Sequence, residues 1–413
     1  MPNESAEHQI QMYPVKSAET RIAVILPVAY SGGSLVGAKL LAKAIHQGSK
    51  NAGQAAKVVF GHLDCPRTYP DEVFSDLPKE IQRRAYHWKV IDKDMAFCAM
   101  RFSHQSFVPT ENAYQIPDDG MNQFLDCDMW IIVSDRLQFP LLPIKPYIVM
   151  VYDYLQRYEK FLSEALNNSF IAAAHRAKQV WVTTDFTRQD AIHYAGLPDN
   201  KILKLPMLIP DFSKAEKHAP VTDEPPYFIW PTNLAPHKNH LNAILALEQY
   251  YEIHNGELSC KITGVNSQLI LDSELPYLTA LTEVVNRSKK LKSKLQFLGE
   301  LSTGAYQAAL SNAEFLWHPA KIDNGTFSVV EAAQLGVPSL SSDYPAMHEM
   351  NKNFALQLKW MQAYSPMDMA TQLKNMESNI NRPDHFQNHY SPTQLQNSEK
   401  SASSYWEAIQ SCL

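Results

Sequence analysis

The chain of 413 residues is longer than one hydrophobic core usually supports, so its length favours two domains. Hydrophobic residues make up 45% of it and aromatic residues 10%, which is typical of a globular protein and excludes a disordered one. The formal net charge of −6 argues against a general nucleic-acid binder, because such proteins carry a basic excess.

The cysteines and the apolar runs indicate the compartment. The five cysteines are scattered, without a CxxC pair or a Cys/His ligand spacing, which favours reduced thiols in a cytosolic protein. The N-terminal stretch MPNESAEHQIQMYP lacks the apolar core of a signal peptide, and no apolar run approaches the roughly 18 residues of a membrane span. We therefore expect a cytoplasmic protein and leave a peripheral contact with the inner face of a membrane open.

Short runs rich in branched apolar residues alternate with helical patterns from Arg21 onward. The runs expected to be strands are RIAVILPV, AKVVFGHL, MWIIVSD, PYIVMVYD and QVWVTT. The stretches with helical spacing between them include LVGAKLLAKAI, SFIAAAHRAK and FTRQDAIHYA. Strands that alternate with helices predict a parallel α/β sheet.

A polar, proline-rich segment, DFSKAEKHAPVTDEPP, interrupts this pattern and is typical of an interdomain linker. The alternation then restarts at YFIWPT and continues through LSCKITG, LQFLGEL, EFLWHPA and PSLSSD. We predict a first domain at 1–210, a linker at 211–226, a second domain at 227–390 and a last helical segment at 391–413. The last helix, SEKSASSYWEAIQ, has no partner in the second domain's pattern, and we expect it to pack back on the first domain.

The stretch IDNGTFSVVEAAQLG follows the expected strand EFLWHPA and begins a helix near Thr326. The free N–H groups of its first turn, preceded by Gly325, are suited to a phosphate. Glu331 lies a turn further in, where a carboxylate accepts hydrogen bonds from a ribose diol. An ordinary helix cap with an incidental glutamate explains the same residues and stays open.

A second loop of the same kind, WPTNLAPHKNH, follows the first strand of the second domain and carries Lys238. A lysine on the crevice that holds the glycine loop would neutralise a diphosphate. Taken alone, a loop lysine is more often a solvated surface residue.

Together these residues resemble glycosyltransferase family 4, retaining enzymes of the GT-B fold that use nucleotide-diphosphate sugars. The family's donor motif, two acidic residues separated by seven, corresponds to Asp323, NGTFSVV and Glu331, with the continuation AAQLGVP. APHKNH resembles the family's lysine loop, and SSDYPAMHEM the loop that follows the motif. The resemblance covers roughly 21–358 and is specific in the second domain and looser in the first.

The sequence departs from the family pattern at three places. The first acid of the motif is Asp323 instead of the usual glutamate, and Asn233 stands where the family has a phosphate-binding arginine. The first-domain His-Asp pair corresponds to Tyr152-Asp153, and a tyrosine does no acid–base work at neutral pH without a large pKa shift. These changes leave donor binding in place and bear on the catalytic assignment.

The resemblance implies a set of site residues. The catalytic candidates are Asp153, Asp323 and Lys238. The residues implied in donor binding are Gly33, Asn233, Lys238, Gly325, Thr326, Phe327, Ser328 and Glu331. Asp323 would lie near the sugar, and the acceptor would bind over the first domain near Gly32-Gly33 and Asp153.

Three other signals are set aside. SGGSLVGAK lacks the Gly-Lys-Ser/Thr of a P-loop, and its paired glycines form either the flexible loop of GT-B enzymes or a simple tight turn. The DCD stretch at 126–128 matches a DxD metal motif but precedes its strand instead of ending one. The histidines show no HExxH motif, so we expect no metal and no cofactor beyond the nucleotide-sugar co-substrate.

The resemblance implies a retaining, metal-independent hexosyltransferase. It would move a sugar, for which mannose or rhamnose is our expectation, to a glycan or lipid-linked acceptor in bacterial surface polysaccharide or lipopolysaccharide biosynthesis. Two alternatives stay open: a non-catalytic GT-B-like binding subunit, and a nucleotide-sugar epimerase or hydrolase. We expect no nucleic-acid partner. The sequence does not indicate whether the protein is a monomer or an oligomer.

Overall fold

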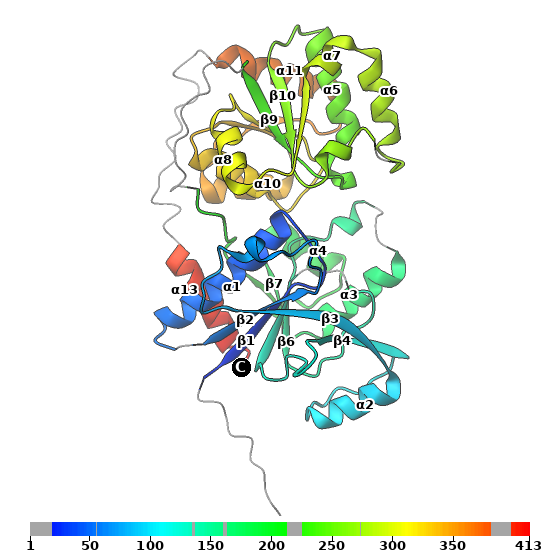
Figure 1. Cartoon of the computed structure of the whole chain (residues 1–413), viewed down its shortest axis with the longest axis vertical. Coiled ribbons are helices and arrows are strands. Elements are labelled where there is room, and N and C mark those ends of the chain that lie inside the picture. The colour runs from blue at the N-terminus through cyan, green and yellow to red at the C-terminus, as the bar shows by residue number, and fades with distance from the viewer. Residues whose placement is uncertain are drawn as a thin grey trace, which may run out of the picture.

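A computed structural model describes residues 19–54, 56–133, 137–159, 163–212, 225–272, 274–380 and 398–413. Within this part, two parallel-type sheets, each covered by helices, lie one above the other (Figure 1). The chain passes from the first sheet to the second between residues 204 and 227. Residues 213–224 of the predicted linker lie outside the described residues, as do 1–18 and 381–397, so the domain boundaries stay predictions.

The first sheet has eight strands in the order β4-β3-β2-β1-β5-β6-β7-β8. Their bounds are β1 Arg21–Ile25, β2 Lys57–Leu63, β3 Gln82–Asp92, β4 Ala113–Asp118, β5 Met129–Val133, β6 Tyr147–Met150, β7 Gln179–Val182 and β8 Ile202–Lys204. Its helices are α1 Gly33–Asn51, α2 Lys93–Phe102, α3 Glu164–Arg176 and α4 Asp185–His193, with 3₁₀ turns η1 Asp71–Phe74, η2 Leu155–Arg157 and η3 Asp199–Lys201.

Burial on both faces explains the apolar runs of the central strands. Ile22 and Val24 of β1 pack into one core cluster, whereas Ala23 and Ile25 pack into the cluster on the opposite face. All five residues of β5 are buried. A parallel strand covered by helices on both sides has no solvent face, and an uninterrupted apolar run is the consequence.

One edge of this sheet differs from the prediction of an all-parallel sheet. β3 pairs with β4 in antiparallel fashion, and α2 connects the two strands. The sequence pattern predicts no element here, because most residues of β3 are partly or fully exposed and the strand lacks an apolar run. An edge ribbon with solvent on one face carries a weaker hydrophobic signal than a central strand.

The second sheet has six strands, all parallel, in the order β11-β10-β9-β12-β13-β14. Their bounds are β9 Tyr227–Pro231, β10 Ser259–Thr263, β11 Leu295–Gly299, β12 Leu316–His318, β13 Ser339–Ser342 and β14 Lys359–Met361. The helices are α5 His240–Glu252, α6 Thr279–Arg287, α7 Lys289–Lys294, α8 Thr303–Ser311, α9 Phe327–Gln334, α10 Pro345–Phe354 and α11 Pro366–Asn379, with the turns η4 Pro236–Lys238 and η5 Ser267–Leu269.

The last helix, α13 (Ser398–Gln410), lies against α1 of the first domain, as the sequence predicts (Figure 1). Trp406 is 1% exposed, and the Tyr405 ring meets the Trp181 ring edge-on at 5.6 Å between centroids. The Tyr405 hydroxyl donates to the carbonyl of Pro206 at 2.9 Å. Residues from the far end of the chain therefore complete the core over one face of the first sheet.

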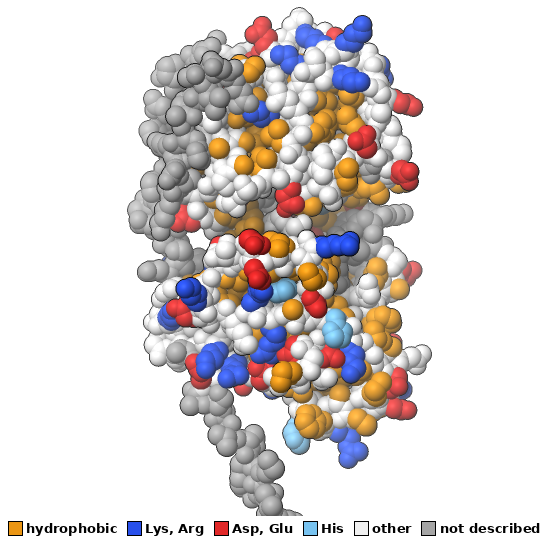
Figure 2. Space-filling model, in the orientation of Figure 1, with side chains coloured by type: hydrophobic (Ala, Val, Ile, Leu, Met, Phe, Trp, Pro, Cys, Tyr) orange, Lys and Arg blue, Asp and Glu red, His pale blue; other side chains and the backbone are white. Residues whose placement is uncertain are grey.

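Charged side chains of both signs are mixed over the face of the molecule in Figure 2. Among the described residues on this face, the lysines and arginines are interspersed with acidic side chains and form no broad basic surface. This distribution agrees with the net charge of −6 and differs from the continuous basic patch of a nucleic-acid-binding surface.

Gly48 allows the close contact between α1 and α13, because a Cβ there would collide with the carbonyl oxygen of Ala402. We expect Gly48→Ala to push the helices apart and lower the free energy of unfolding by about 1–3 kcal/mol, as overpacking does. Gly304→Ala in α8 is the matched control, since a Cβ there meets nothing within 4 Å. Urea denaturation measures both variants, and equal midpoints would refute the close-packing argument.

Candidate functional site

The topology of the second sheet decides where its polar loops meet. The chain runs from β9 outward to β10 and β11, and then returns to the other side of β9 with β12, β13 and β14. The loops after β9 and β12 therefore leave neighbouring strands in opposite directions and open a crevice, where open α/β sheets bind ligands. The loop after β9 carries Lys238, and the loop after β12 carries Asp323.

Lys238 and Asp323 form an ion pair in this crevice, with 2.5 Å between Nζ and Oδ2. Their side chains are 16% and 12% exposed, so the pair lies mostly out of solvent. The other carboxylate oxygen, Oδ1, accepts the backbone N–H of Asn324 at 2.8 Å. Two residues that the sequence analysis assigns to one site, 85 positions apart, are thus in direct contact.

Asp323 is held in its ionised form. Burial alone would raise the pKa of its carboxyl, but Lys238 outweighs burial through its charge and its hydrogen bond, so the pKa lies below its usual value. His237 Nε2 lies 3.9 Å from Asp323 Oδ2. A permanent negative charge therefore stands beside the lysine at neutral pH.

Three buried histidines, to which the sequence motifs assign no role, lie near this pair. Burial, followed by the charge of Lys238, lowers the pKa of His237 and His318 to about 3, and burial lowers that of His240 to about 4. His318 Nε2 lies 2.9 Å from the hydroxyl of Tyr344. These imidazoles are neutral at pH 7 and add dipoles, not positive charge, to the crevice.

The helix α9 begins as the sequence predicts, with Thr326 as its N-cap and Phe327 as its first residue. No side chain caps the N-terminal N–H groups, and the hydroxyls of Thr326 and Ser328 lie 3.0 Å apart. Gly325 has a φ of +87°, and a Cβ there would collide with Met350 Sδ. Only glycine fits this turn without strain.

Glu331 lies on α9 and is 8% exposed. Its Oε2 accepts a hydrogen bond from the Tyr306 hydroxyl of α8 at 3.0 Å, a contact that sequence spacing does not reveal. Burial raises the pKa of Glu331 to about 7, against the effect of this hydrogen bond. Near neutral pH both the protonated and the charged form of the carboxyl are therefore populated, and a ligand that donates hydrogen bonds would favour the charged form.

The glycine pair of the first domain faces the second domain. Gly32 has a φ of +63° and precedes α1, of which Gly33 is the first residue. A Cβ on Gly33 would lie 3.9 Å from Phe327 Cδ2, and one on Gly32 would lie 3.4 Å from Val265 Cγ2. The structure thus brings Gly33 next to the beginning of α9.

Asn233 is exposed, and its Oδ1 accepts the N–H of Ala235 at 3.0 Å. Its side chain stabilises its own turn in the loop after β9. It supplies no positive charge, as the departure from the family pattern predicts.

Asp153 follows β6 in the first domain, and its Oδ1 accepts the N–H of Leu155 at 3.3 Å. The preceding Tyr152 packs against α1, where a Cβ on Gly37 would lie 2.7 Å from its hydroxyl. Burial raises the pKa of Tyr152 well above its ordinary value, so the phenol stays neutral. Tyr152 therefore cannot replace a histidine in proton transfer.

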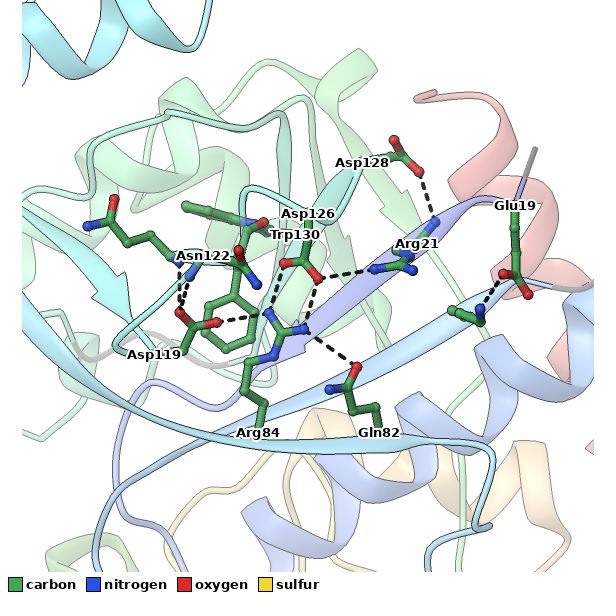
Figure 3. A network of polar contacts seen from close by, with 12 residues as sticks. Glu19, Arg21, Gln82, Arg84, Asp119, Asn122, Asp126, Asp128 and Trp130 are labelled. Carbon is green, nitrogen blue, oxygen red and sulfur yellow. Dashed lines mark hydrogen bonds and ion pairs between the residues drawn. The ribbon is translucent and has the colours of Figure 1, made fainter. Parts of the chain in front are cut away.

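The DCD stretch has a structural role at the opposite end of the first sheet (Figure 3). Asp126 accepts hydrogen bonds from Arg84 at 2.8 and 2.9 Å and from Arg21 at 3.3 Å. Asp128 accepts the backbone N–H of Arg21 at 2.8 Å, and Asp119 binds Arg84 at 2.9 Å. These carboxylates therefore accept hydrogen bonds from arginine side chains and from the backbone.

The described part of the chain offers neither a cluster of metal ligands nor a membrane-spanning helix. No group of three or more His, Cys, Asp or Glu side chains among them has an arrangement that could hold a metal ion. In the same part of the chain, every helix is too short or too polar to cross a bilayer.

Solved structures share this architecture. HepE from Anabaena, in a complex with UDP-glucose, matches with a TM-score of 0.64 and 12% identity over 96% of this chain and 100% of its own. WaaG, a glycosyltransferase involved in lipopolysaccharide biosynthesis, matches with a TM-score of 0.55 and 13% identity over 94% and 95%. The UDP-GlcNAc 2-epimerase from Methanocaldococcus jannaschii matches with a TM-score of 0.51 and 9% identity, over 95% of this chain and 100% of its own. The protein has the GT-B fold.

Residues 211–389 match the family model described as Glycosyl transferases group 1. This segment contains the second sheet and every donor-binding candidate except Gly33, and the match supports a glycosyltransferase of the group 1 type. A CTP synthase from Rhodospirillum rubrum is 37% identical over 75 residues. The match spans 18% of this chain and only 14% of that protein's length, so it carries no argument about function.

The raised pKa of Glu331 predicts a pH-dependent stability. The folded state holds the proton more tightly than the unfolded chain, so the free energy of unfolding falls as pH rises from about 4.5 to about 7. Glu331→Gln removes this effect and keeps an acceptor for Tyr306. The free energy of unfolding of the variant minus that of wild type should therefore be larger at pH 8 than at pH 5, by on the order of 1–3 kcal/mol.

Chemical denaturation at the two pH values measures this gain. Glu283→Gln, on the exposed side of α6, is the matched control and should differ from wild type equally at both. A Glu331→Gln effect that is the same at pH 5 and pH 8 would contradict the raised pKa.

Proposed function

We propose that the protein is a retaining glycosyltransferase that uses a nucleotide-diphosphate sugar and needs no metal. The observation that carries the proposal is the meeting of Lys238 and Asp323 beside the N-terminus of α9, at the switch point of the second sheet. The family match over this segment and the similarity to HepE, whose structure holds UDP-glucose, support the donor class.

Departure of the nucleoside diphosphate builds negative charge at the crevice. The N–H groups of Gly325 to Ser328 and the dipole of α9 stabilise this charge without reorganising, and the Lys238 ammonium adds a full positive charge. Lys238 is paired with Asp323, so a bound diphosphate competes with the carboxylate for it. Glu331 holds the ribose diol deeper in the site, next to Tyr306.

The sugar lies between the two domains. Asp323, ionised and fixed by the N–H of Asn324, orients the sugar hydroxyls and supports positive charge at the anomeric carbon. Asp153 and Gly33 face the acceptor from the first domain. Closure of the domains on the ligand excludes water, so transfer to the acceptor proceeds ahead of hydrolysis.

The finer identity of the reaction rests on analogy. We propose mannose or rhamnose as the sugar and a glycan or lipid-linked glycan as the acceptor, in bacterial surface polysaccharide biosynthesis. We place the reaction in the cytoplasm, with a peripheral contact at the inner face of the membrane. The similarity to WaaG supports a lipopolysaccharide-related pathway.

A second candidate is a nucleotide-sugar epimerase or hydrolase, which the similarity to the UDP-GlcNAc 2-epimerase favours. Such an enzyme turns over its donor without an acceptor. The presence of Tyr152 and Asn233 favours a third candidate, a non-catalytic binding subunit. Such a subunit binds the nucleotide sugar but does not cleave it, so no nucleoside diphosphate is formed.

A donor screen separates these functions. Purified protein is incubated with UDP-, GDP- and dTDP-sugars, with and without glycan acceptors, and released nucleoside diphosphate is measured. We expect release that depends on an acceptor. Rapid release or isomerisation without one would establish the second candidate, and absence of turnover with measurable binding would establish the binding subunit.

Substitutions at Glu331 and Lys238 test the donor site itself. We expect Glu331→Ala to weaken nucleoside diphosphate binding by about 1.5–3 kcal/mol, the range for hydrogen bonds to a charged group. Lys238→Ala should weaken binding as well, but its larger effect should fall on kcat, because charge on the leaving group is greatest in the transition state.

Titration calorimetry with UDP and GDP and steady-state kinetics measure these effects. Lys352→Ala, at an exposed lysine of α10, is the control and should bind nucleotide as wild type does. Unchanged affinity in both site variants, with losses of activity that follow lowered thermal stability, would rule out the donor-site assignment.

A further inference from the structure

The loop that carries Asp323 is tied to the first domain on both sides of this residue. Before it, Lys321 Nζ donates to Glu159 Oε1 at 2.9 Å. After it, Asn324 is buried among three threonines of the first domain. A loop that belongs to the second domain by sequence is therefore held by the first domain at both ends, while the Asp323 side chain points back to Lys238.

The Asn324 cluster is almost fully out of solvent. The Asn324 side chain accepts the hydroxyls of Thr184 and Thr187 at 2.5 Å each, and it donates to Thr183 Oγ1 at 3.1 Å. These four residues are between 1% and 4% exposed. Buried amides and hydroxyls are costly to leave without partners, so this cluster specifies one arrangement of the two domains.

The same cluster reaches both predicted carboxylates. On the second domain, the N–H of Asn324 donates to Asp323 Oδ1 at 2.8 Å. On the first domain, the Thr187 hydroxyl shares its single proton between Asn324 Oδ1 at 2.5 Å and the carbonyl of Tyr152 at 3.1 Å, and Tyr152 directly precedes Asp153. A single set of hydrogen bonds thus fixes the backbone beside Asp323 and beside Asp153.

We infer that Asn324 and Thr187 are positioning residues that hold Asp323 and Asp153 in register across the cleft. This inference rests on the proposed function, and it adds that the donor loop acquires its working geometry only while the first domain is seated on it. Asn324 acts through its neighbours and through the turn at Gly325, and it touches neither reacting group.

Three variants test this inference. Asn324→Ala removes the three hydrogen bonds of the cluster that cross between the domains, Thr187→Val removes one hydroxyl at constant shape, and Thr187→Ser keeps the hydroxyl. We expect the first two to speed hydrogen–deuterium exchange in the peptide covering 321–327 and to lower kcat about 10- to 100-fold, as a small misplacement of reacting groups does. Affinity for UDP or GDP should fall less than kcat does, because Lys238 and Glu331 keep their contacts with the phosphate and the ribose. Thr187→Ser should behave as wild type.

Glu349→Ala is the matched control, because Glu349 on α10 also joins the domains but bonds to Asp185 and Lys204 instead of to the donor loop. It accepts the N–H of Asp185 at 2.7 Å and the Lys204 ammonium at 2.5 Å. This variant should weaken the contact between domains and leave exchange at 321–327 unchanged.

Two results would overturn the inference: unchanged exchange at 321–327 in Asn324→Ala and Thr187→Val, or an equal loss of kcat in Glu349→Ala. If wild type itself turns over no donor, the proposed function fails, whereas the exchange measurement still decides whether the cluster positions the loop.

Discussion

The parallel pairing of β9 with β10 on one side and β12 on the other is the constraint on which the candidate site depends. Because the chain connections leave this strand pair in opposite directions, the loops after β9 and β12 part and leave room between them. Lys238 comes from one loop and Asp323 from the other, and α9 points its N-terminus into the same space. Any ligand with phosphate groups meets a lysine and free backbone N–H groups there.

The crevice combines charges of very different character. Asp323 is buried but compensated, since a lysine and a backbone N–H face its two oxygens. Glu331 is buried with a single neutral partner, and its pKa rises accordingly. The protein thus keeps one carboxylate permanently ionised and a second close to its titration point within one short helix and its preceding loop. Such contrasts arise where side chains are arranged for a ligand more often than where they serve the fold alone.

Much of this arrangement could be predicted from local sequence. The α9 N-terminus follows from an apolar helix preceded by Gly325 and Thr326, and the position of Lys238 follows from its place after a strand. Tyr306 and Asn324 could not be predicted in the same way, because their partners lie 25 and about 140 positions away and carry no spacing signal. The sequence pattern does not predict the edge ribbon of β3 and β4 for a different reason. Most of β3 is at least partly exposed, so hydrophobic periodicity is weak there.

The packing of α13 on α1 has a consequence for how the protein is made. Ala402, Tyr405, Trp406, Ala408 and Ile409 belong to the core cluster over one face of the first sheet. A ribosome that has released only the first domain has therefore produced a sheet with this face covered by α1 but not by α13. The part of the face that α13 covers remains open until the second domain and the last helix have been synthesised. The first half of the protein thus reaches its final state last, and a stalled or truncated chain would present this face to chaperones and proteases.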